Sequence, residues 1–206
     1  MIKTIIFDLG GVIILEPHDS WKTFLPKMAA MFGIDSDVLA SEFINNRVRL
    51  QTGKMTLLDL FKKISSVSGR QTDPKDLLQK YLELYKESCG GEYDMKLLDI
   101  VHKLRRKFKV ACFTNIEIEI AEFHRQKGLF NNFDYAFVST EMGMRKPDLV
   151  SFQYVIKKLG INPSEGIFID NHKAYVTGAK KAGLNGIVYT KREKLIKDLS
   201  KFIEIK

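Results

Sequence analysis

The stretch that decides the fold stands at the start of the chain: Ile2-Lys3-Thr4-Ile5-Ile6-Phe7-Asp8-Leu9-Gly10-Gly11. Apolar and β-branched residues fill its first part and favour a strand that is buried on both faces. Asp8 and the Gly10-Gly11 pair follow directly, which is typical of a strand that ends in a tight loop. Because strands buried on both faces belong mainly to parallel sheets, this opening predicts an α/β protein.

Later segments repeat this apolar strand pattern, and helical segments alternate with them. Such alternation predicts right-handed βαβ crossovers and therefore a doubly wound, Rossmann-like parallel sheet. The predicted strands are Ile2–Phe7, Val110–Phe113, Tyr135–Val138, Gly166–Ile169 and Gly186–Tyr189, and the predicted helices are Asp94–Phe108, Glu117–Lys127, Asp148–Leu159 and Lys173–Ala182.

The stretch between the first two strands has helical periodicity alone. We expect this block, residues 16–89, to form a helical cap over the carboxyl ends of the strands, where open α/β sheets bind ligands. Residues 1–15 and 90–206 then form the α/β core. The helices predicted within the cap are Trp21–Phe32, Asp37–Leu50, Thr56–Val67 and Asp73–Glu87.

Composition restricts the class of protein. Of the 206 residues, 45% are hydrophobic and 28% are charged, which is ordinary for a globular domain. The early apolar run from Gly10 to Leu15 is far shorter than the roughly 20 residues of a membrane-spanning helix, and no small-residue cleavage site follows it. The 2 cysteines allow one disulfide and form no zinc pattern, so we expect a cytoplasmic protein without membrane attachment, with Cys112 packed in the core.

The formal net charge of +8 raises the question of a polyanionic partner. The basic residues are spread through several helical segments, and no nucleic-acid-binding motif accompanies them. We therefore interpret them as solvated helix faces and predict no nucleic-acid partner. The sequence leaves the oligomeric state open.

Polar residues gather where the predicted strands end. Because parallel strands end at one edge of a sheet, these side chains should meet in one cleft. Each alone has a structural explanation, since Asp, Thr and Asn cap turns and helices and a lone lysine is ordinary in a loop. The ordered set favours chemistry instead. Its members are Asp8, Thr114, Asn115, Lys146, Asp170 and Asn171.

This set suits phosphoryl transfer to water from a small phosphorylated substrate. Asp8 and Asp170 can hold Mg²⁺, a hard cation that prefers oxygen ligands, and the ion offsets repulsion between a carboxylate and a phosphate. Asp8 can then attack phosphorus in line and form an aspartyl-phosphate. Thr114, Asn115 and Lys146 are expected to bind the phosphoryl oxygens. Gly10 and Gly11 let backbone amides approach the same oxygens.

The segments that carry these residues resemble the motifs of the haloacid dehalogenase (HAD) superfamily, in the family's order and spacing. The segments are Phe7-Asp8-Leu9-Gly10-Gly11-Val12-Ile13, Phe113-Thr114-Asn115, Glu141–Asp148 and Phe168-Ile169-Asp170-Asn171. The resemblance spans nearly the whole chain, and the helical block stands where the family carries its cap. It implies a Mg²⁺-dependent hydrolase with Asp8 as nucleophile. The implied metal ligands are Asp8, the Gly10 carbonyl and Asp170, with Asn171 in a secondary position.

Two positions depart from the pattern that phosphatases of this family usually show. Gly10 stands where they carry a second aspartate that serves as general acid and base, and Asn171 replaces a second acid of the fourth motif. General acid catalysis contributes roughly 10²–10⁴-fold, so we expect a slow or leaving-group-selective phosphatase. With a glycine at this position, the chain resembles a subgroup of the family that includes the epoxide-hydrolase N-terminal phosphatase and bacterial glucose-1-phosphate phosphatase relatives.

Residues just after the first motif lie within reach of the cleft mouth, and His18 among them is a candidate substitute proton donor. We favour a surface linker over that role, and weigh His172 in the same way. Arg145 either adds positive potential for phosphate or faces solvent. The residues after the first motif are Glu16, His18, Asp19 and Trp21.

Two alternative functions remain open beside the phosphatase. Loss of both secondary acids motivates a non-catalytic or weakly active binding or regulatory protein on the same fold. A 2-haloacid dehalogenase is disfavoured because Asp170 is retained within a metal-type motif, and because no arginine-bearing loop follows the nucleophile as it does in dehalogenases of this superfamily.

Overall fold

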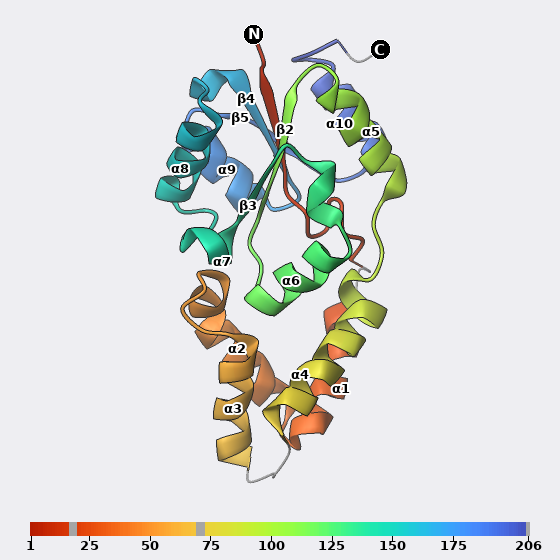
Figure 1. The fold of residues 1–206 in the computed structure, drawn as a ribbon, viewed down its shortest axis with the longest axis vertical. Coiled ribbons are helices and arrows are strands. Elements are labelled where there is room, and N and C mark those ends of the chain that lie inside the picture. Colours follow the sequence, from red (N-terminus) through yellow and green to blue (C-terminus); the bar gives the residue numbers. More distant parts are fainter. Residues whose placement is uncertain (17–19, 69–72, 205–206) are drawn as a thin grey trace.

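The computed structural model describes residues 1–16, 20–68 and 73–204. In this part of the chain a 5-stranded parallel sheet forms in the order β3-β2-β1-β4-β5 (Figure 1). The α/β fold with a parallel sheet is therefore confirmed. The strands are β1 (Thr4–Phe7), β2 (Lys109–Thr114), β3 (Tyr135–Val138), β4 (Gly166–Asp170) and β5 (Asn185–Val188).

The strand order puts β1 at the centre, between β2 and β4. Phe7 lies opposite Cys112 on one side and opposite Ile169 on the other. The three strands therefore end side by side, and the residues that finish them are brought to one edge. Two predicted strands proved longer than expected, because Thr114 ends β2 and Asp170 ends β4 within the ladder rather than after it.

Side chains of β1 alternate between two hydrophobic clusters, as the strand's period of two requires. Ile5 and Phe7 pack with α5 and α10, whereas Ile6 packs with α8 and α9 on the opposite face. All of β1 is buried, which confirms the strand predicted from the opening sequence. The helices of the α/β part are α5 (Met95–Arg105), α6 (Ile118–Gln126), α7 (Ser139–Met142), α8 (Leu149–Leu159), α9 (Lys173–Lys181) and α10 (Arg192–Leu199).

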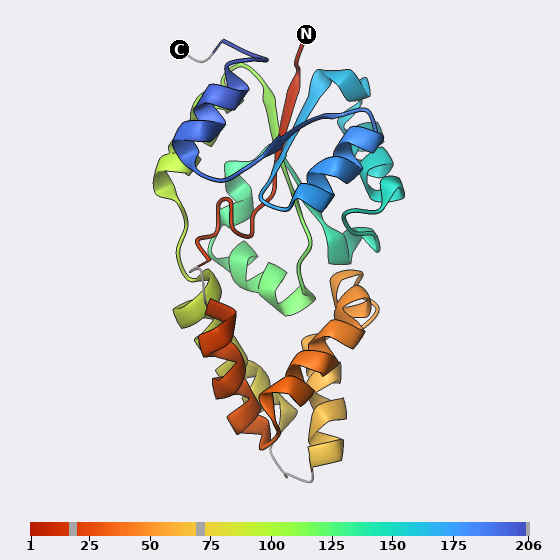
Figure 2. The same ribbon diagram turned by 180° about the vertical axis from the view of Figure 1, so that it is seen from behind.

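Helices α1 to α4, called the cap helices below, lie together beyond the carboxyl ends of the strands (Figures 1 and 2). Aromatic rings hold them to one another: Phe24 and Phe43 each meet Tyr81, at ring-centroid distances of 5.2 Å and 6.2 Å. Asp73 caps α4 by accepting from the Lys75 amide at 2.9 Å, as predicted for this helix start. The cap helices are α1 (Ser20–Phe32), α2 (Ser36–Gln51), α3 (Leu57–Ser68) and α4 (Pro74–Tyr85).

The chain leaves the α/β part and returns to it along adjacent paths. The Leu15 amide donates to the Glu92 carbonyl at 3.0 Å, and the Asp94 amide donates to the Ile13 carbonyl at 2.8 Å. A π-helical turn, Lys86–Gly90, precedes the returning segment. The division into residues 16–89 and the remainder stays a prediction.

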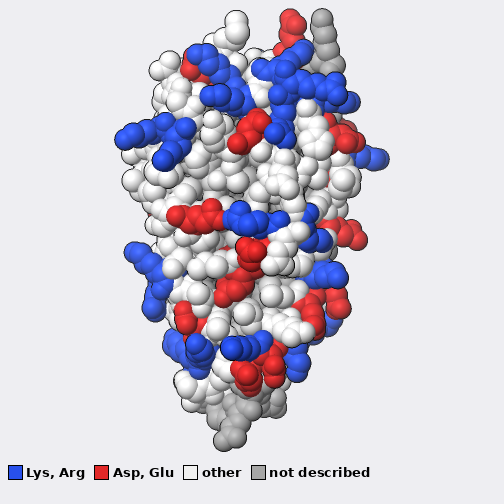
Figure 3. Space-filling view, in the orientation of Figure 1, with Lys and Arg blue, Asp and Glu red and all other residues white. Residues whose placement is uncertain are grey.

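Elements that the sequence did not predict are short or weakly amphipathic. They include α7, α10 and the 3₁₀ turns Leu129–Asn132 and Pro163–Glu165. Cys112 is buried in β2, as expected of a core residue. None of the helices in the described part combines the length and apolar character that a membrane-spanning helix needs. On the face seen in Figure 3, Lys and Arg are interspersed with Asp and Glu, as expected of solvated helix faces.

Candidate active site

A buried lysine joins two acidic side chains from different strands. Asp8 directly follows β1, Asp170 ends β4, and Lys146 lies in the loop between α7 and α8. The Lys146 Nζ donates to Asp8 Oδ1 and to Asp170 Oδ2, each at 2.7 Å. Lys146 and Asp170 are 0% exposed and Asp8 is 5% exposed. Buried charges are costly unless paired, and here a single ammonium pairs with both carboxylates. With both carboxylates ionised, the cluster keeps one net negative charge.

Burial and charge shift the ionisation of this cluster. Burial raises the pKa of Asp8 to about 6, although the neighbouring Lys146 ammonium opposes the shift. Burial alone would lower the pKa of Lys146, but the two carboxylates outweigh it and the pKa is raised. Lys146 therefore stays protonated and remains a donor to whatever binds at Asp8.

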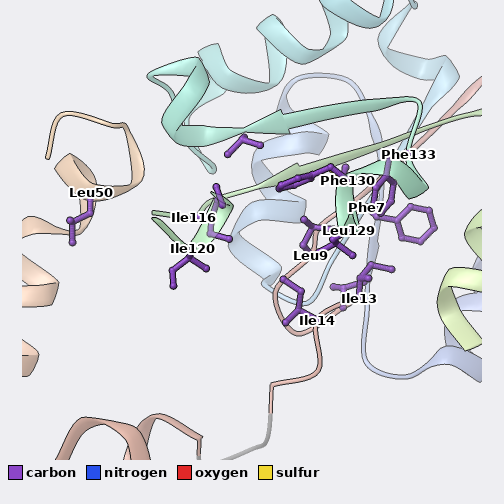
Figure 4. Packing of buried hydrophobic residues seen from close by; sticks show 14 of the residues in the cluster. Phe7, Leu9, Ile13, Ile14, Leu50, Ile116, Ile120, Leu129, Phe130 and Phe133 are labelled. Carbon is purple, nitrogen blue, oxygen red and sulfur yellow. The ribbon is translucent and has the colours of Figure 1, made fainter. Parts of the chain in front are cut away.

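Hydrophobic anchors fix the loop that carries Asp8. Leu9 and Ile13 are fully buried and pack in one cluster with Leu129 and Phe130 (Figure 4). The Leu9 carbonyl accepts from the Ile13 and Ile14 amides at 2.9 Å and 2.8 Å, which closes a tight turn directly after Asp8. The position of Asp8 is thus fixed by strand β1 before it and by this packed turn after it.

Gly11 meets a steric requirement in this turn. Its φ is +66°, and a Cβ at this position would lie 2.3 Å from Asn171 Nδ2. Any side chain here would be strained and would collide with the loop after β4. The Asn171 side chain therefore packs against Gly11 of the Asp8 loop. Its secondary position at a metal site stays a prediction.

Asn115 has a clear positional role. Its Nδ2 donates to the Lys146 carbonyl at 2.8 Å, and its Oδ1 accepts from the Lys146 amide at 2.9 Å. The pair of bonds fixes the loop backbone that presents the Lys146 ammonium. Asn115 also lines a cavity beside Asp8 and Lys146, and its contact with a phosphate stays a prediction.

A cavity of about 330 Å³ opens above this cluster. Both parts of the molecule line it, so a bound molecule would touch the strand ends and the cap helices together. Gly11, Asp170 and Asn171, which the sequence also placed at the site, are not among the residues that line this cavity. The α/β part contributes Asp8, Gly10, Thr114, Asn115 and Lys146, and the cap helices contribute Trp21, Arg47, Gln51 and Tyr85.

Further acidic groups face the same cavity. Glu16, on the segment leading to the cap helices, has its pKa raised to about 7 by burial and by the Asp8 charge. Burial likewise raises the pKa of Glu117, against a hydrogen bond from Gln51. The sequence placed Glu16, Trp21 and His172 near the cleft, and all of them line it. His18 and Asp19 lie outside the described residues.

Some cavity residues had no signal in the sequence. Glu117 directly precedes α6 and indicated only the start of a predicted helix. Arg47 and Tyr175 lie within helices whose sequence pattern is explained by packing. Arg145 donates from Nε to Gln51 Oε1 at 3.1 Å, so it joins the two parts of the molecule instead of facing solvent.

A buried histidine ties the returning segment to α6. His124 is 0% exposed, and its Nε2 and Nδ1 pair with the Tyr85 and Tyr93 hydroxyls, each at 2.9 Å. Burial lowers the pKa of His124 to about 4. The neutral ring donates to one tyrosine and accepts from the other, so both hydroxyls are engaged.

The oxygen atoms at the strand ends fit a magnesium ion. Asp8 and Asp170 offer carboxylates, and the buried Asn171 Oδ1 has no hydrogen-bond partner among the described residues. Mg²⁺ takes such hard ligands and usually keeps several waters, so two carboxylates suffice. In residues 1–16, 20–68 and 73–204, no group of three or more His, Cys, Asp or Glu side chains is placed to hold a metal.

Comparison with known proteins places the chain in a family. Residues 2–183 match the haloacid dehalogenase-like hydrolases, and the chain belongs to that family. The chain is 25% identical over 192 residues to a D-ribitol-5-phosphate phosphatase of Bacteroides thetaiotaomicron, covering 89% of each. It is 32% identical over 205 residues to flavin mononucleotide hydrolase 1 of Arabidopsis thaliana, covering 97% of this chain and 77% of that protein.

A solved structure has the same fold. A HAD family enzyme from Bacteroides thetaiotaomicron, in complex with magnesium and inorganic phosphate, superposes with a TM-score of 0.76 at 21% identity. The match covers 92% of this chain and 95% of that chain. The superfamily predicted from the motifs is therefore confirmed, and the protein is a haloacid dehalogenase-like hydrolase.

Proposed function

We propose that the protein is a Mg²⁺-dependent phosphatase that hydrolyses a small phosphorylated metabolite through an aspartyl-phosphate on Asp8. The observation that carries this proposal is the buried Lys146 ammonium, bonded at 2.7 Å to both Asp8 and Asp170, at the base of a cavity. A carboxylate nucleophile needs positive charge beside it to accept an anionic phosphate.

The residues divide the work of two successive displacements. An Asp8 carboxylate oxygen bonds to phosphorus while the ester oxygen leaves, and water then attacks phosphorus to release inorganic phosphate and restore Asp8. Lys146 holds Asp8 in place and neutralises charge, and Thr114 donates to a phosphoryl oxygen. Asp8, Asp170 and the Gly10 carbonyl would hold Mg²⁺, which would supply further positive charge at the phosphoryl group.

The size of the cavity and the relatives support the substrate class. About 330 Å³ accommodates a small metabolite, and residues of both parts of the molecule surround it. The relatives named for D-ribitol 5-phosphate and flavin mononucleotide act on phosphate monoesters. Gly10 supports a place beside the epoxide-hydrolase N-terminal phosphatase and glucose-1-phosphate phosphatase subgroup. We propose a cytoplasmic location and no nucleic-acid partner.

A screen of phosphorylated metabolites with wild-type protein and Asp8→Asn tests the proposal. We expect phosphate release that requires Mg²⁺, ceases with a chelator and is lost in the variant. Release that survives in Asp8→Asn would remove Asp8 from the nucleophile role. No release, together with no Asp8-dependent beryllium fluoride adduct, would favour a non-catalytic protein. Metal-independent halide release from haloacids would favour a dehalogenase.

A further inference from the structure

The Glu16 carboxyl group stands beside the position where the chain lacks a side chain. A Cβ added to Gly10 would lie 2.8 Å from Glu16 Oε1 and 3.8 Å from Glu16 Cδ. The Glu16 carboxyl therefore occupies the volume that any side chain at residue 10 would enter. Glu16, Gly10 and Asp8 all line the same cavity.

The position of Glu16 suits the leaving group of an ester held over Asp8. In-line attack places the leaving oxygen on the far side of phosphorus from Asp8, toward the cap helices. The Glu16 carboxyl lies beside Gly10, two residues after Asp8, and Glu16 lines the cavity into which the leaving group would extend. An alkoxide is a poor leaving group unless it receives a proton as its bond to phosphorus breaks.

Other polar residues of the cavity are less suited to this transfer. The Lys146 ammonium is committed to Asp8 and Asp170, and Asn115 is bonded to the backbone of Lys146. A hydrogen bond with Gln51 engages Glu117, and the exposed His172 ring packs against Tyr175 with centroids 5.0 Å apart. Glu16 is left as the carboxyl group nearest the residue-10 side of the nucleophile.

We propose that Glu16 is the catalytic acid and base of this site, an inference that rests on the proposed phosphatase function. In the first displacement the Asp8–phosphorus bond forms, the phosphorus–ester oxygen bond breaks, and the Glu16 proton passes to the departing oxygen to give the alcohol. In the second, the Glu16 carboxylate takes a proton from water as the water oxygen bonds to phosphorus, the bond between the Asp8 oxygen and phosphorus breaks, and phosphate leaves. Glu16 ends protonated, as it began.

The geometry makes residues 10 and 16 mutually dependent. Gly10→Ala places a methyl group 2.8 Å from Glu16 Oε1, and the flexible glutamate must move aside. Asp8 and Lys146 are untouched by this change. Gly10→Ala should therefore reproduce part of the defect of Glu16→Gln without altering residue 16.

The test compares two leaving groups. The substrates are p-nitrophenyl phosphate, whose phenolate leaves unprotonated, and the best alkyl phosphate from the metabolite screen. We expect Glu16→Gln to lower kcat/KM for the alkyl ester by about 10²–10⁴-fold and to leave kcat/KM for p-nitrophenyl phosphate within about threefold. Gly10→Ala should shift the same ratio in the same direction. Glu92→Gln, an exposed charge change on the returning segment, is the matched control and should match wild type.

A burst experiment gives a second readout. Because Glu16→Gln also slows water attack, nitrophenolate should appear in a burst stoichiometric with enzyme, followed by slow turnover. Equal losses on both substrates, or no loss on either, would overturn the role of Glu16. If the wild-type protein releases phosphate from no ester, the phosphatase itself fails, and the role of Glu16 fails with it.

Discussion

The two walls of the cavity differ in how firmly they are held. On the α/β side, Asp8 and Lys146 are buried, and the Lys146 ammonium and backbone take part in four hydrogen bonds of 2.7–2.9 Å. On the cap side, long side chains reach in from helices, and Arg47 meets Tyr175 only at 3.5 Å. We infer from this contrast that the α/β side, the rigid wall, fixes the reaction of the proposed phosphatase. The cap side, the adaptable wall, would then fit itself to the substrate. Substitutions in each wall test this contrast.

Removing the proposed nucleophile should have the largest effect. Asp8→Asn keeps the shape of the side chain but lacks a nucleophilic carboxylate, so kcat should fall by at least about 10⁴-fold. Steady-state phosphate release measures the loss, and circular dichroism checks that the fold is kept. Activity within tenfold of wild type would contradict the role assigned to the rigid wall.

Removing the charge between the two carboxylates should cost stability as well as activity. Lys146→Met leaves Asp8 and Asp170 buried without their common partner, and we expect a loss of about 3–5 kcal/mol in the free energy of unfolding. Urea unfolding in the presence of chelator measures it. Lys157→Met, an exposed change on α8, is the control and should stay within about 0.5 kcal/mol. Equal stability of both variants would show that the cluster is not tightly coupled to the fold.

The histidine between the two parts should make stability depend on pH. The pKa of His124 is about 4 when folded and near 6.5 when unfolded, so the unfolded state binds more protons between these values. The contribution of His124 to the free energy of unfolding is therefore fully present above about pH 6.5 and is lost as the pH falls toward 4. We expect His124 to account for about 2 kcal/mol between pH 7 and pH 5.

Urea unfolding at both pH values, with His124→Gln beside wild type, isolates this contribution. The variant should lose the His124 part of the pH dependence, whereas His102→Gln, at an exposed histidine, should retain it. The same pH dependence in all three proteins would assign the effect to other groups.

Changes in the adaptable wall should affect substrate choice with little effect on chemistry. Arg47→Ala should lower kcat/KM for the preferred metabolite by about 10–100-fold and leave p-nitrophenyl phosphate within about threefold, because the small ester does not span the cavity. Arg49→Ala on the same helix is the control, since Arg49 does not line the cavity. A parallel loss on both substrates would place Arg47 in the reaction itself.

The sequence predicts most of the rigid wall and little of the adaptable one. Asp8, Thr114 and Asp170 end adjacent strands, and strand ends are visible in local hydrophobic patterns. The two hydrogen bonds between Asn115 and Lys146 join residues that are 31 positions apart in the sequence. The hydrogen bond between His124 and Tyr85 joins residues that are 39 positions apart. No local pattern marks such contacts.

Glu16 shows the same limit. Its approach to Gly10 depends on the path of the chain after the tight turn, which packing of Leu9 and Ile13 determines. The helix α10 was missed because its apolar stripe is narrow, with Leu195 and Leu199 as its buried residues. The burial of α10 depends on its packing against the sheet, which the sequence of the helix alone does not indicate.

The adjacent paths of the outgoing and returning segments have a consequence for the history of such molecules. Leu15 pairs with Glu92 and Ile13 with Asp94, so the whole intervening block is spliced into the chain at almost one point. At the sheet, the two ends of this block lie as close together as the two ends of a short hairpin loop. A lineage can therefore lengthen, shorten or replace it and acquire a new selectivity, while the registry of the strands that hold the reacting groups is inherited unchanged.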